Sequence, residues 1–338
     1  MIKKNILVVS NSPFFGGGEQ FIVEILSNVQ NSFFLVRNEK LYDALNTEKK
    51  RLFSYSTNNV KKEEFSEIKN AIQKWNIDIV ILNGGSTIYY SPFLKNVKII
   101  IYRHTTNLYV SNFIKRLLYV ILLHICYIFA QKIIHVSDYS RNEQMLFKRK
   151  SYTVHNGLRQ LDYSISKIKH NPLRLLFLSR VTESKGIKDI VEIVSKFPPN
   201  EVILDIVGDG NLSDWVKNKT NEQIHFYGFQ KDVSSFYKNS DVFILLSHYE
   251  NCPLSIIDAM KYGLPILATA VGGIPELVKN GYNGFLVSER QELEEKIYEL
   301  IKNEKFYATL SANAIKTFKT SFSSERVIDN VQRIVNSI

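Results

Sequence analysis

Two carboxylates flank a predicted helix start in the second half of the chain, Glu250 before it and Asp258 within it. A buried strand at residues 242–246 leads into a polar loop, and the helix opens at Pro253, whose missing N–H would be unpaired there anyway. Such a loop turns backbone N–H groups and the positive end of the helix toward a ligand, which suits a phosphate. Because carboxylates bind phosphate poorly, we expect the two acids to hold hydroxyl groups of a sugar or a ribose.

A second loop, residues 178–186, supplies cations between another predicted strand and its helix. Arg180 offers a planar fork of donors and Lys185 a point charge, and both suit a diphosphate. Gly186 allows a close backbone approach. The chain has no Asp-x-Asp motif for a divalent metal, so fixed cations and a helix N-terminus would neutralise a departing diphosphate instead. The plain alternative is a solvated strand–helix loop.

Residues 247–287 resemble the donor-binding signature of the retaining nucleotide-sugar glycosyltransferases of family 4, which have the two-domain GT-B fold. That family carries a Glu, seven residues, a second Glu, an Ala-Met pair and a Gly-Leu-Pro strand. Glu250 occupies the first acidic position here, and Asp258 stands at the second, where the family has Glu. The resemblance covers nearly the whole chain and is strongest from about residue 175 to residue 287.

The resemblance implies which residues bind the donor. Arg180 and Lys185 would bind the donor diphosphate and stabilise the leaving group, while Glu250 would hold the sugar. No clear nucleophile is expected, so the acceptor hydroxyl would attack the face from which the nucleotide diphosphate leaves. The other donor-binding residues that we expect are Gly208, Gly228, Phe229, Asn251, Cys252, Pro253, Leu254, Ser255, Asp258 and Glu276.

Two of these residues have ordinary structural interpretations as well. Glu276 fits a first-turn acid favoured by the helix dipole as well as it fits a ligand contact. Cys252 has no histidine paired with it in the sequence, and we interpret it as a small residue that fills the pocket.

A glycine-rich loop follows the first predicted strand, and the resemblance places the acceptor and the donor sugar in front of it. Gly17, Gly18 and Glu19 open the first helix of the chain. They are not part of a dinucleotide fingerprint, because its third glycine would fall on Phe21. A flexible strand–helix turn is the alternative.

Arg103 and His104 follow another predicted strand, again at a carboxyl end. A lone histidine is more often structural than catalytic. The resemblance implies, however, that His104 touches the donor sugar near the reacting carbon, and Arg103 would contact a phosphate of the acceptor. The predicted catalytic residues are therefore Glu250, His104, Arg180 and Lys185.

Short apolar strands alternate with helical patterns along both halves of the chain, which is typical of parallel, doubly wound sheets. We predict an α/β fold of the GT-B type, with two Rossmann-like domains facing a cleft. The predicted parts are an acceptor-binding domain at 1–160, a donor-binding domain at 161–322 with a linker at 158–171, and a C-terminal helix at 323–338 that packs back on the first domain. Predicted strands cover 6–10, 33–36, 77–82, 97–103, 133–136, 152–154, 173–178, 202–207, 224–227, 242–246, 265–269 and 284–287.

A length of 338 residues and a hydrophobic content of 45% suit two globular domains. The two cysteines, Cys126 and Cys252, lack metal-ligand spacing and favour a reducing cytosol. The N-terminal apolar run is too short for a signal peptide. The longest apolar run, residues 117–130, is shorter than the roughly 20 residues that cross a bilayer. We therefore expect a cytoplasmic location, peripheral at the inner face of the cell membrane.

The net charge of +10 is concentrated in the first half of the chain. Residues 1–160 hold 22 Lys and Arg against 11 Asp and Glu, whereas residues 161–338 hold 21 against 22. A basic half implies an anionic partner, either acidic lipid headgroups, a lipid-linked diphosphate or nucleic acid, although a lysine-rich proteome would produce the same excess. No nucleic-acid-binding signature is present.

Residues 113–130, basic at the start and then almost wholly apolar, fit either a helix at a membrane interface or a buried helix.

The resemblance to family 4 implies a retaining, metal-independent hexosyltransferase without a cofactor. Its donor would be a nucleotide diphosphate sugar and its acceptor a glycan or lipid-linked saccharide, in bacterial surface polysaccharide synthesis. Three alternatives stay open: an epimerase or phosphorylase on the same fold, a non-catalytic glycan-binding or partner subunit, and a Rossmann oxidoreductase. The intact set of Arg180, Lys185 and Glu250 argues against the second, and the broken fingerprint argues against the third.

Overall fold

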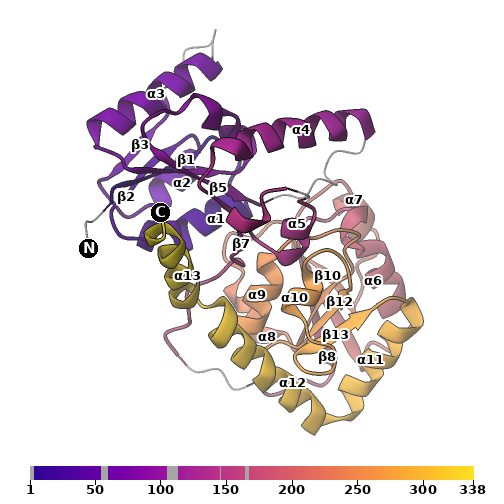
Figure 1. Ribbon diagram of the computed structural model, residues 1–338. Coiled ribbons are helices and arrows are strands. Elements are labelled where there is room, and N and C mark those ends of the chain that lie inside the picture. Colours follow the sequence, from indigo (N-terminus) through magenta and orange to yellow (C-terminus); the bar gives the residue numbers. More distant parts are fainter. Residues whose placement is uncertain (1–3, 55–59, 105–112, 145, 164–166) are drawn as a thin grey trace. The chain divides into compact units, whose positions relative to one another are not determined.

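The computed structural model describes residues 4–54, 60–104, 113–144, 146–163 and 167–338. The chain divides into two compact units, one of residues 1–159 with 324–338 and the other of residues 160–323. Each unit is built on a parallel sheet with helices packed around it (Figure 1). The prediction of an α/β chain with two Rossmann-like sheets is therefore confirmed.

The sheet of the first unit has the strand order β3-β2-β1-β4-β5-β6-β7, and all its strand pairs are parallel. The order reverses between β1 and β4, as in a doubly wound sheet. Both of these strands are buried on both faces, which explains their unbroken runs of Ile, Leu and Val. The strands are β1 (Ile6–Ser10), β2 (Ser32–Val36), β3 (Lys50–Leu52), β4 (Ile79–Asn83), β5 (Lys98–Arg103), β6 (Lys132–His135) and β7 (Ser151–Thr153). The helices are α1 (Gly17–Glu24), α2 (Glu39–Ala44), α3 (Val60–Lys74), α4 (Phe113–Phe129), α5 (Asp138–Asn142) and α13 (Ser324–Asn336), with 3-10 turns at Leu26–Asn28, Gly85–Phe93 and Lys148–Lys150.

The strand β3 was missed by the sequence analysis. It is a three-residue edge strand with the sequence Lys-Arg-Leu, and it pairs with β2 from Lys50 opposite Phe34 to Leu52 opposite Val36. Such a short, partly exposed edge strand carries no apolar alternation. Backbone pairing and not side-chain burial defines it, so the sequence has no signal for it.

The sheet of the second unit has the order β10-β9-β8-β11-β12-β13 and is also parallel. Its order reverses between β8 and β11. Three of its strands match the predicted ranges, and the other three are one residue shorter. The strands are β8 (Leu173–Leu178), β9 (Val202–Val207), β10 (Ile224–Phe226), β11 (Val242–Leu245), β12 (Ile266–Thr269) and β13 (Gly284–Val287). The helices are α6 (Ile187–Val194), α7 (Ser213–Lys217), α8 (Ser234–Asn239), α9 (Leu254–Lys261), α10 (Ile274–Leu277), α11 (Arg290–Lys302) and α12 (Glu304–Thr317), with a 3-10 turn at Glu183–Lys185 and a π-turn at Phe318–Phe322.

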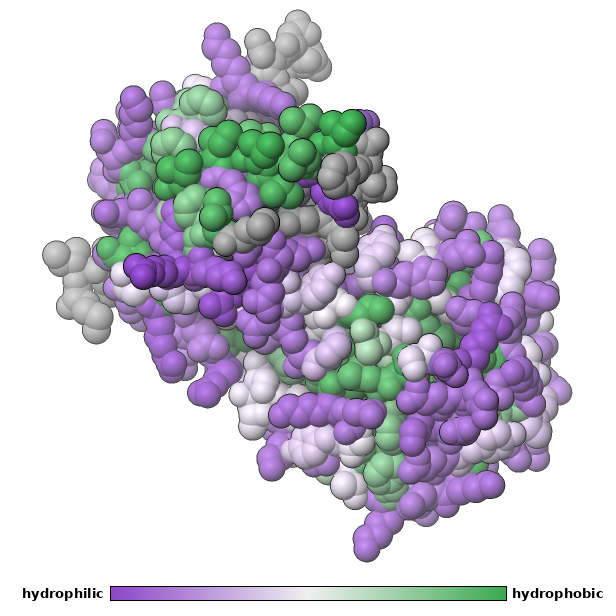
Figure 2. Space-filling view, turned by 45° about the vertical axis from the view of Figure 1, so that its right-hand side comes forward, coloured by the Kyte–Doolittle hydropathy of each residue, from purple (hydrophilic) through white to green (hydrophobic). Residues whose placement is uncertain are grey.

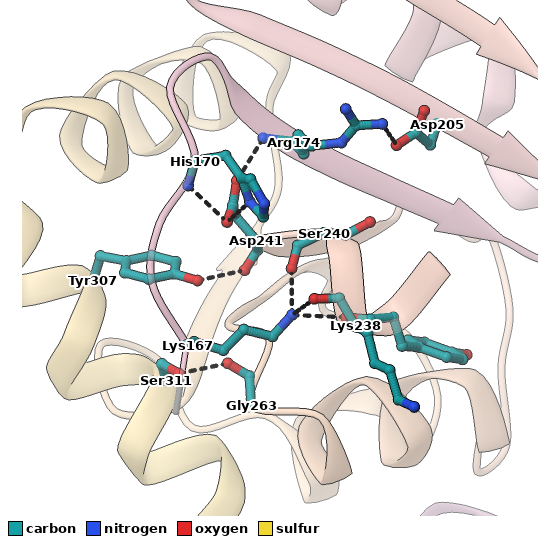
Figure 3. A network of polar contacts seen from close by, with 11 residues as sticks. Lys167, His170, Arg174, Asp205, Lys238, Ser240, Asp241, Gly263, Tyr307 and Ser311 are labelled. Carbon is teal, nitrogen blue, oxygen red and sulfur yellow. Dashed lines mark hydrogen bonds and ion pairs between the residues drawn. The ribbon is translucent and has the colours of Figure 1, made fainter. Parts of the chain in front are cut away.

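The predicted linker, residues 158–171, ends in a clamp that belongs to the second unit (Figure 3). Lys167 Nζ donates to three carbonyl oxygens at the end of α8, at 2.6 to 2.8 Å. The Asp241 carboxylate accepts from the backbone N–H groups of His170 and Arg174 at 3.1 and 2.8 Å. These contacts fix the chain before it enters β8.

The helix α13 groups with the first unit. The Ser324 N–H donates to the carbonyl oxygen of Leu158 at 2.9 Å, and Gln332 Oε1 accepts from the Gln30 N–H at 3.3 Å. Apolar residues at helical spacing along α13, Val331 among them, are buried. The last helix is therefore anchored by both its backbone and its apolar face.

A buried histidine makes the first unit sensitive to acid. His135, at the end of β6, is fully buried with Nε2 2.9 Å from Gln144 Oε1. Burial, and then the charge of Arg103, lower the pKa of His135 to about 3 from its ordinary value of 6.5. Between these values the unfolded chain binds a proton that the folded chain does not, so the stability is full above about pH 6.5 and falls as the pH drops toward 3.

When the pH is lowered from 7 to 5, the unfolding free energy of the wild type should fall by about 2 kcal/mol more than that of His135→Gln. Glutamine keeps polar atoms beside Gln144 but cannot titrate. Urea unfolding at the two pH values measures the difference. His225→Gln, in the second unit, is the matched control. If His135→Gln loses as much stability as the wild type, the acid sensitivity has another source.

Candidate active site

The carboxyl ends of β8 and β11 bring together two charged residues of the predicted donor site. These strands are neighbours at the point where the strand order reverses, which is where open α/β sheets bind ligands. Lys185, after β8, and Glu250, after β11, form an ion pair there, with 10% and 13% of their side chains exposed. The Ser247 hydroxyl also donates to Glu250 Oε1, at 3.0 Å. The fold thus joins two residues that are 65 positions apart in the sequence.

Hydrogen bonds to backbone oxygens hold the loops of this edge against one another. The His248 N–H donates to a carbonyl oxygen of the loop after β8 at 2.9 Å. The Gly273 N–H donates to the carbonyl oxygen of Glu250 at 3.2 Å, and Thr269 Oγ1 donates to that of Ser247 at 2.6 Å. The ion pair therefore joins the loops after β8 and β11, and the loop after β12 supports them.

Two glycines permit this close approach of the loops. Gly186 has a φ of +71°, and a Cβ there would lie 2.2 Å from the carbonyl oxygen of Leu246. Gly272 has a φ of +56°, and its Cβ would lie 1.8 Å from the carbonyl oxygen of Glu250. Only glycine satisfies both the backbone conformation and the space. At Gly186 the close approach is to the backbone of the loop after β11, and an approach to a ligand there stays a prediction.

Arg180 lies in the same loop as Lys185 but differs in environment. Its side chain is exposed and makes no ion pair or hydrogen bond with the part of the chain that the structure describes. Its backbone is held, because its carbonyl oxygen accepts from the Thr182 N–H at 2.9 Å. Lys185 is thus held by an ion pair, whereas the side chain of Arg180 is exposed.

The helix α9 begins at Leu254, one residue later than predicted. Pro253 is its N-cap, with a φ of −68° and an extended ψ of 118°. The N–H groups of the first turn, among them those of Leu254 and Ser255, have no acceptor within the helix. Cys252 is buried beside this turn, next to the half-buried Asn251. The helix start therefore presents donors at the edge that carries the ion pair.

Asp258 is engaged within its own helix. Its carboxylate pairs with Lys261 Nζ at 2.6 Å. Burial raises the pKa of Asp258, and the Lys261 ammonium acts in the opposite direction. The two acids of the motif thus have different partners, since Glu250 pairs with a loop lysine and Asp258 with a helix lysine.

The loops after β9 and β10 complete the edge. Gly208 has a φ of +135°, and a Cβ there would lie 1.9 Å from the carbonyl oxygen of Ser179, so the loops after β8 and β9 touch. The Gly208 N–H donates to the carbonyl oxygen of Gly228 at 2.9 Å. The neighbouring Phe229 is 74% exposed. Glu276 lies in the first turn of α10, as the helix-dipole interpretation requires.

In the first unit, His104 lies directly after β5. Its Nε2 is 2.9 Å from Oδ1 of Asn83, which ends β4, and Nδ2 of Asn83 donates to the Gly18 carbonyl oxygen at 3.4 Å. Because the amide nitrogen is used as a donor, Oδ1 accepts and the imidazole proton is on Nε2. Burial lowers the pKa of His104 to about 4, so the ring is neutral at pH 7.

The His104 ring is held by its neighbours. Tyr102 stacks on it with ring centroids 4.8 Å apart, and Phe21 contacts it edge-on at 5.8 Å. A Cβ at Gly18 would lie 3.3 Å from the imidazole. Gly18 therefore has a packing reason to be glycine, besides its predicted place in the acceptor loop.

Two of the predicted acceptor residues have their polar groups engaged inside the first unit. Glu19, in α1 after Gly17, is 6% exposed and accepts from Ser10 Oγ and from the Gly16 N–H, both at 3.1 Å. Arg103 is 1% exposed and donates to the Tyr127 hydroxyl at 3.2 Å. Both residues support the fold of this edge, and a contact of either with an acceptor stays a prediction.

The sequence analysis missed two residues of these edges, Ser247 and Asn83. Each is a polar residue at or just after the end of a buried strand. Asn83 precedes Gly84 and Gly85, and this polar–Gly–Gly step is the signal that could have marked it.

Residues 159–317 match the family model described as glycosyl transferases group 1. The second unit is a group 1 glycosyltransferase domain. Its Lys185–Glu250 pair therefore lies in a domain of a transferase family. The family model identifies group 1, and the narrower resemblance to family 4 stays a prediction.

Curated relatives of this group 1 glycosyltransferase domain include two enzymes with stated activities. The N-acetyl-alpha-D-glucosaminyl L-malate synthase of Bacillus anthracis is 28% identical over 203 residues, 57% of this chain and 51% of that protein. The UDP-Gal:alpha-D-GlcNAc-diphosphoundecaprenol alpha-1,3-galactosyltransferase of Escherichia coli is 27% identical over 184 residues, 51% of this chain and 47% of that protein. The chain thus spans about half the length of these relatives.

The structural likeness extends over both units. The crystal structure of Anabaena HepE in complex with UDP matches 99% of this chain and 100% of that chain, with a TM-score of 0.85 and 19% identity. A likeness at this identity concerns the fold alone. The predicted GT-B fold of this chain is confirmed.

We expect Gly272→Ala to lower the unfolding free energy of the second unit by about 3 kcal/mol, because the methyl group adds a backbone clash to the strain of a positive φ. Gly281→Ala is the matched control, since Gly281 has a φ of +71° with nothing within 4 Å of its Cβ position, and it should cost only about 1 kcal/mol. Denaturant unfolding of both variants measures the difference. Equal losses would show that the contact with Glu250 does not matter.

Proposed function

We propose that this protein is a retaining glycosyltransferase that moves a hexose-type sugar from a nucleotide diphosphate donor to a hydroxyl group of a glycan or lipid-linked saccharide. The observation that carries the proposal is the Lys185–Glu250 pair at the switch point of a group 1 glycosyltransferase domain. A cation and an acid at one edge of a sheet suit the two parts of such a donor, its diphosphate and its sugar hydroxyls.

The diphosphate part of the donor would be bound by Lys185, by Arg180 and by the first-turn N–H groups of α9. Lys185 is already held in place by Glu250, so little reorganisation is needed when negative charge develops on the leaving group. Arg180 has an exposed side chain that can turn toward the phosphates. The exposed ring of Phe229 is assigned to the nucleotide base.

The role of Glu250 follows from how its two oxygens are used. Lys185 and Ser247 both donate to Oε1, and Oε2 has no hydrogen bond to the residues that the structure describes. An ionised carboxylate accepts hydrogen bonds at both oxygens. We therefore assign Oε2 to a hydroxyl group of the donor sugar.

In the proposed reaction, the bond between the sugar carbon and the diphosphate oxygen breaks, and the acceptor oxygen bonds to the same face of that carbon. The acceptor proton passes to the departing phosphate oxygen, and Lys185 stabilises the charge on the diphosphate. The sugar carries a short-lived oxocarbenium-like charge beside Glu250. On the acceptor side, His104 acts as a neutral hydrogen-bonding group, because its pKa of about 4 keeps it uncharged at pH 7.

The setting that we propose is bacterial surface polysaccharide synthesis with a lipid-linked acceptor, at the cytoplasmic face of an anionic membrane. The support is twofold. The Escherichia coli relative is named for a diphosphoundecaprenol-linked acceptor, and the first half of this chain carries the excess of basic residues. The reaction would need neither cofactor nor metal, since Lys185 and Arg180 would supply the positive charge that stabilises the leaving diphosphate.

A thermal-shift screen with UDP-, GDP-, ADP- and TDP-sugars tests the donor assignment. At a concentration one hundred times its dissociation constant, the correct donor adds about 2.7 kcal/mol to the stability of the unit that binds it. We expect a rise in melting temperature with sugars of one nucleotide only. Stabilisation by NAD alone would favour an oxidoreductase instead.

We expect Lys185→Ala to lower turnover by orders of magnitude while the protein stays folded, because the leaving group loses its fixed cation. Lys188→Ala, three residues on, removes a half-buried lysine that pairs with Glu183 at 3.4 Å; it is the matched control and should keep its turnover. A sugar-transfer assay and a melting curve on both variants make the test. Near wild-type turnover in Lys185→Ala would remove the lysine from the mechanism.

Treatment with EDTA tests the metal-independent part of the proposal. We expect turnover to stay within about twofold of its untreated value. Loss of activity that is restored by a divalent cation would contradict it, while leaving the donor assignment in place.

A further inference from the structure

The helix α4 carries an apolar stripe on its exposed side. Eight of its Ile, Leu and Phe side chains are between 43% and 67% exposed. The members of this α4 stripe are Ile114, Leu117, Leu118, Ile121, Leu122, Ile125, Ile128 and Phe129. Their spacing follows the helical repeat, so they lie on one side of the helix. The stripe belongs to the hydrophobic band that crosses the first unit in Figure 2.

The opposite side of α4 packs into the core of the first unit. Leu123, Cys126 and Tyr127 are buried there. A surface helix of a globular protein has its polar face outward, whereas α4 is apolar on both sides. An exposed apolar surface of this extent is typical of an interaction site. No helix among the described residues is long and apolar enough to cross a bilayer.

The stretch of sequence that contains α4 is basic. From residue 79 to residue 137 the sequence holds six Lys and Arg and no Asp or Glu. Lys115, in the first turn of α4, is exposed. Lys148 and Arg149 are exposed as well, and they follow Leu146, which is 57% exposed.

Residues 146–149 join the stripe to a basic hollow. Leu146 and Phe147 line an apolar groove of about 450 Å³ together with residues of α4. The next two residues, Lys148 and Arg149, line a second hollow of about 630 Å³ together with Arg141 and Arg333. An apolar groove and a cluster of cations thus lie on either side of one short segment.

The segment is fixed to α4 by Lys150. Its Nζ donates to the carbonyl oxygens of Tyr127 and Ala130 at 2.5 and 2.7 Å, at the C-terminal end of the helix. Arg141 is held by Asp138 at 3.5 Å. The groove and the basic hollow therefore keep their positions relative to each other within the first unit.

We propose that the α4 stripe and the basic hollow form one docking surface for an anionic phospholipid bilayer. The stripe would lie flat among the acyl chains, and the cations of the hollow would bind lipid phosphate groups. This inference deepens the proposed function, since it names the surface by which the first unit reaches a lipid-linked acceptor. Only the biological role of the surface rests on the proposed function; membrane binding itself does not.

The charges favour a bilayer over a second copy of the chain. Two copies joined through their stripes would bring the exposed Lys148 and Arg149 of each copy toward the basic first unit of the other. Like charges opposed at an interface disfavour association. Each cation near an anionic membrane instead strengthens binding about fivefold.

Vesicle flotation with the full chain tests the proposal. We expect binding to vesicles of equal parts phosphatidylglycerol and phosphatidylcholine, loss of binding in high salt, and little binding to phosphatidylcholine alone. Leu118→Glu should weaken binding to the anionic vesicles at least tenfold. Ile168→Glu is the matched control, because Ile168 is 81% exposed in the second unit, and it should bind as the wild type does.

The basic hollow is tested separately. Lys148→Ala with Arg149→Ala should weaken binding about 25-fold, whereas Lys302→Ala with Lys305→Ala, which removes the same charge from the second unit, should have little effect. If both double variants lost the same amount of vesicle binding, the net charge of the chain alone would explain it. That result would overturn the basic hollow as a lipid-binding site.

Two further results would overturn the docking surface as a whole. One is a wild-type chain that does not float with anionic vesicles at low salt. The other is a wild-type dimer in sedimentation that Leu118→Glu converts to a monomer. Donor binding in lipid-free solution should be the same in Leu118→Glu and the wild type. If the chain floats but no nucleotide-sugar stabilises it, the docking surface stands and the proposed function falls.

Discussion

The ion pair between Lys185 and Glu250 is the contact on which the carboxyl edge of the second unit depends. A largely buried ammonium or carboxylate that lacks its partner costs several kcal/mol, so each residue needs the other to stay in place. They can meet only where the loops after β8 and β11 touch. Gly186 and Gly272 permit that contact, and the strand order brings the loops side by side. The chemistry at this edge is therefore a consequence of the packing of two backbones.

The first unit also buries a titratable side chain at the carboxyl edge of its sheet, but there the side chain is neutral. His104 also sits at the carboxyl edge of a parallel sheet, and its Nε2 is hydrogen-bonded to the neutral amide of Asn83. Burial then lowers its pKa to about 4, and the ring stays neutral. The edge of the second unit thus keeps two charged side chains as an ion pair, whereas the edge of the first unit holds an uncharged histidine. An acid and a cation fit the polar donor that we propose, and a neutral imidazole fits a hydroxyl-rich acceptor.

The fold could be predicted because central parallel strands are buried on both faces and read as unbroken apolar runs. The edge strand β3 lacks such a run and was missed. At the site, Lys185 and Glu250 could be named from residue type and loop position. Their pairing could not, because it follows from β8 and β11 becoming neighbours across 65 residues. Arg103 is a cation at the end of a strand, a position that is often exposed. Only the structure shows that it is buried and donates to Tyr127.

The helix α4 shows where sequence patterns reach their limit. A helix that is apolar all round fits a buried position and a membrane interface equally well, since hydropathy does not say how many of its faces have protein beside them. Within the part of the chain that the structure describes, one face of α4 is buried, through Leu123, Cys126 and Tyr127. The α4 stripe on the other face is therefore apolar surface that stays exposed after the first unit has folded. Because the sequence from residue 79 to residue 137 is basic, and the exposed Lys148 and Arg149 line the neighbouring hollow, an anionic partner with an apolar interior satisfies both features.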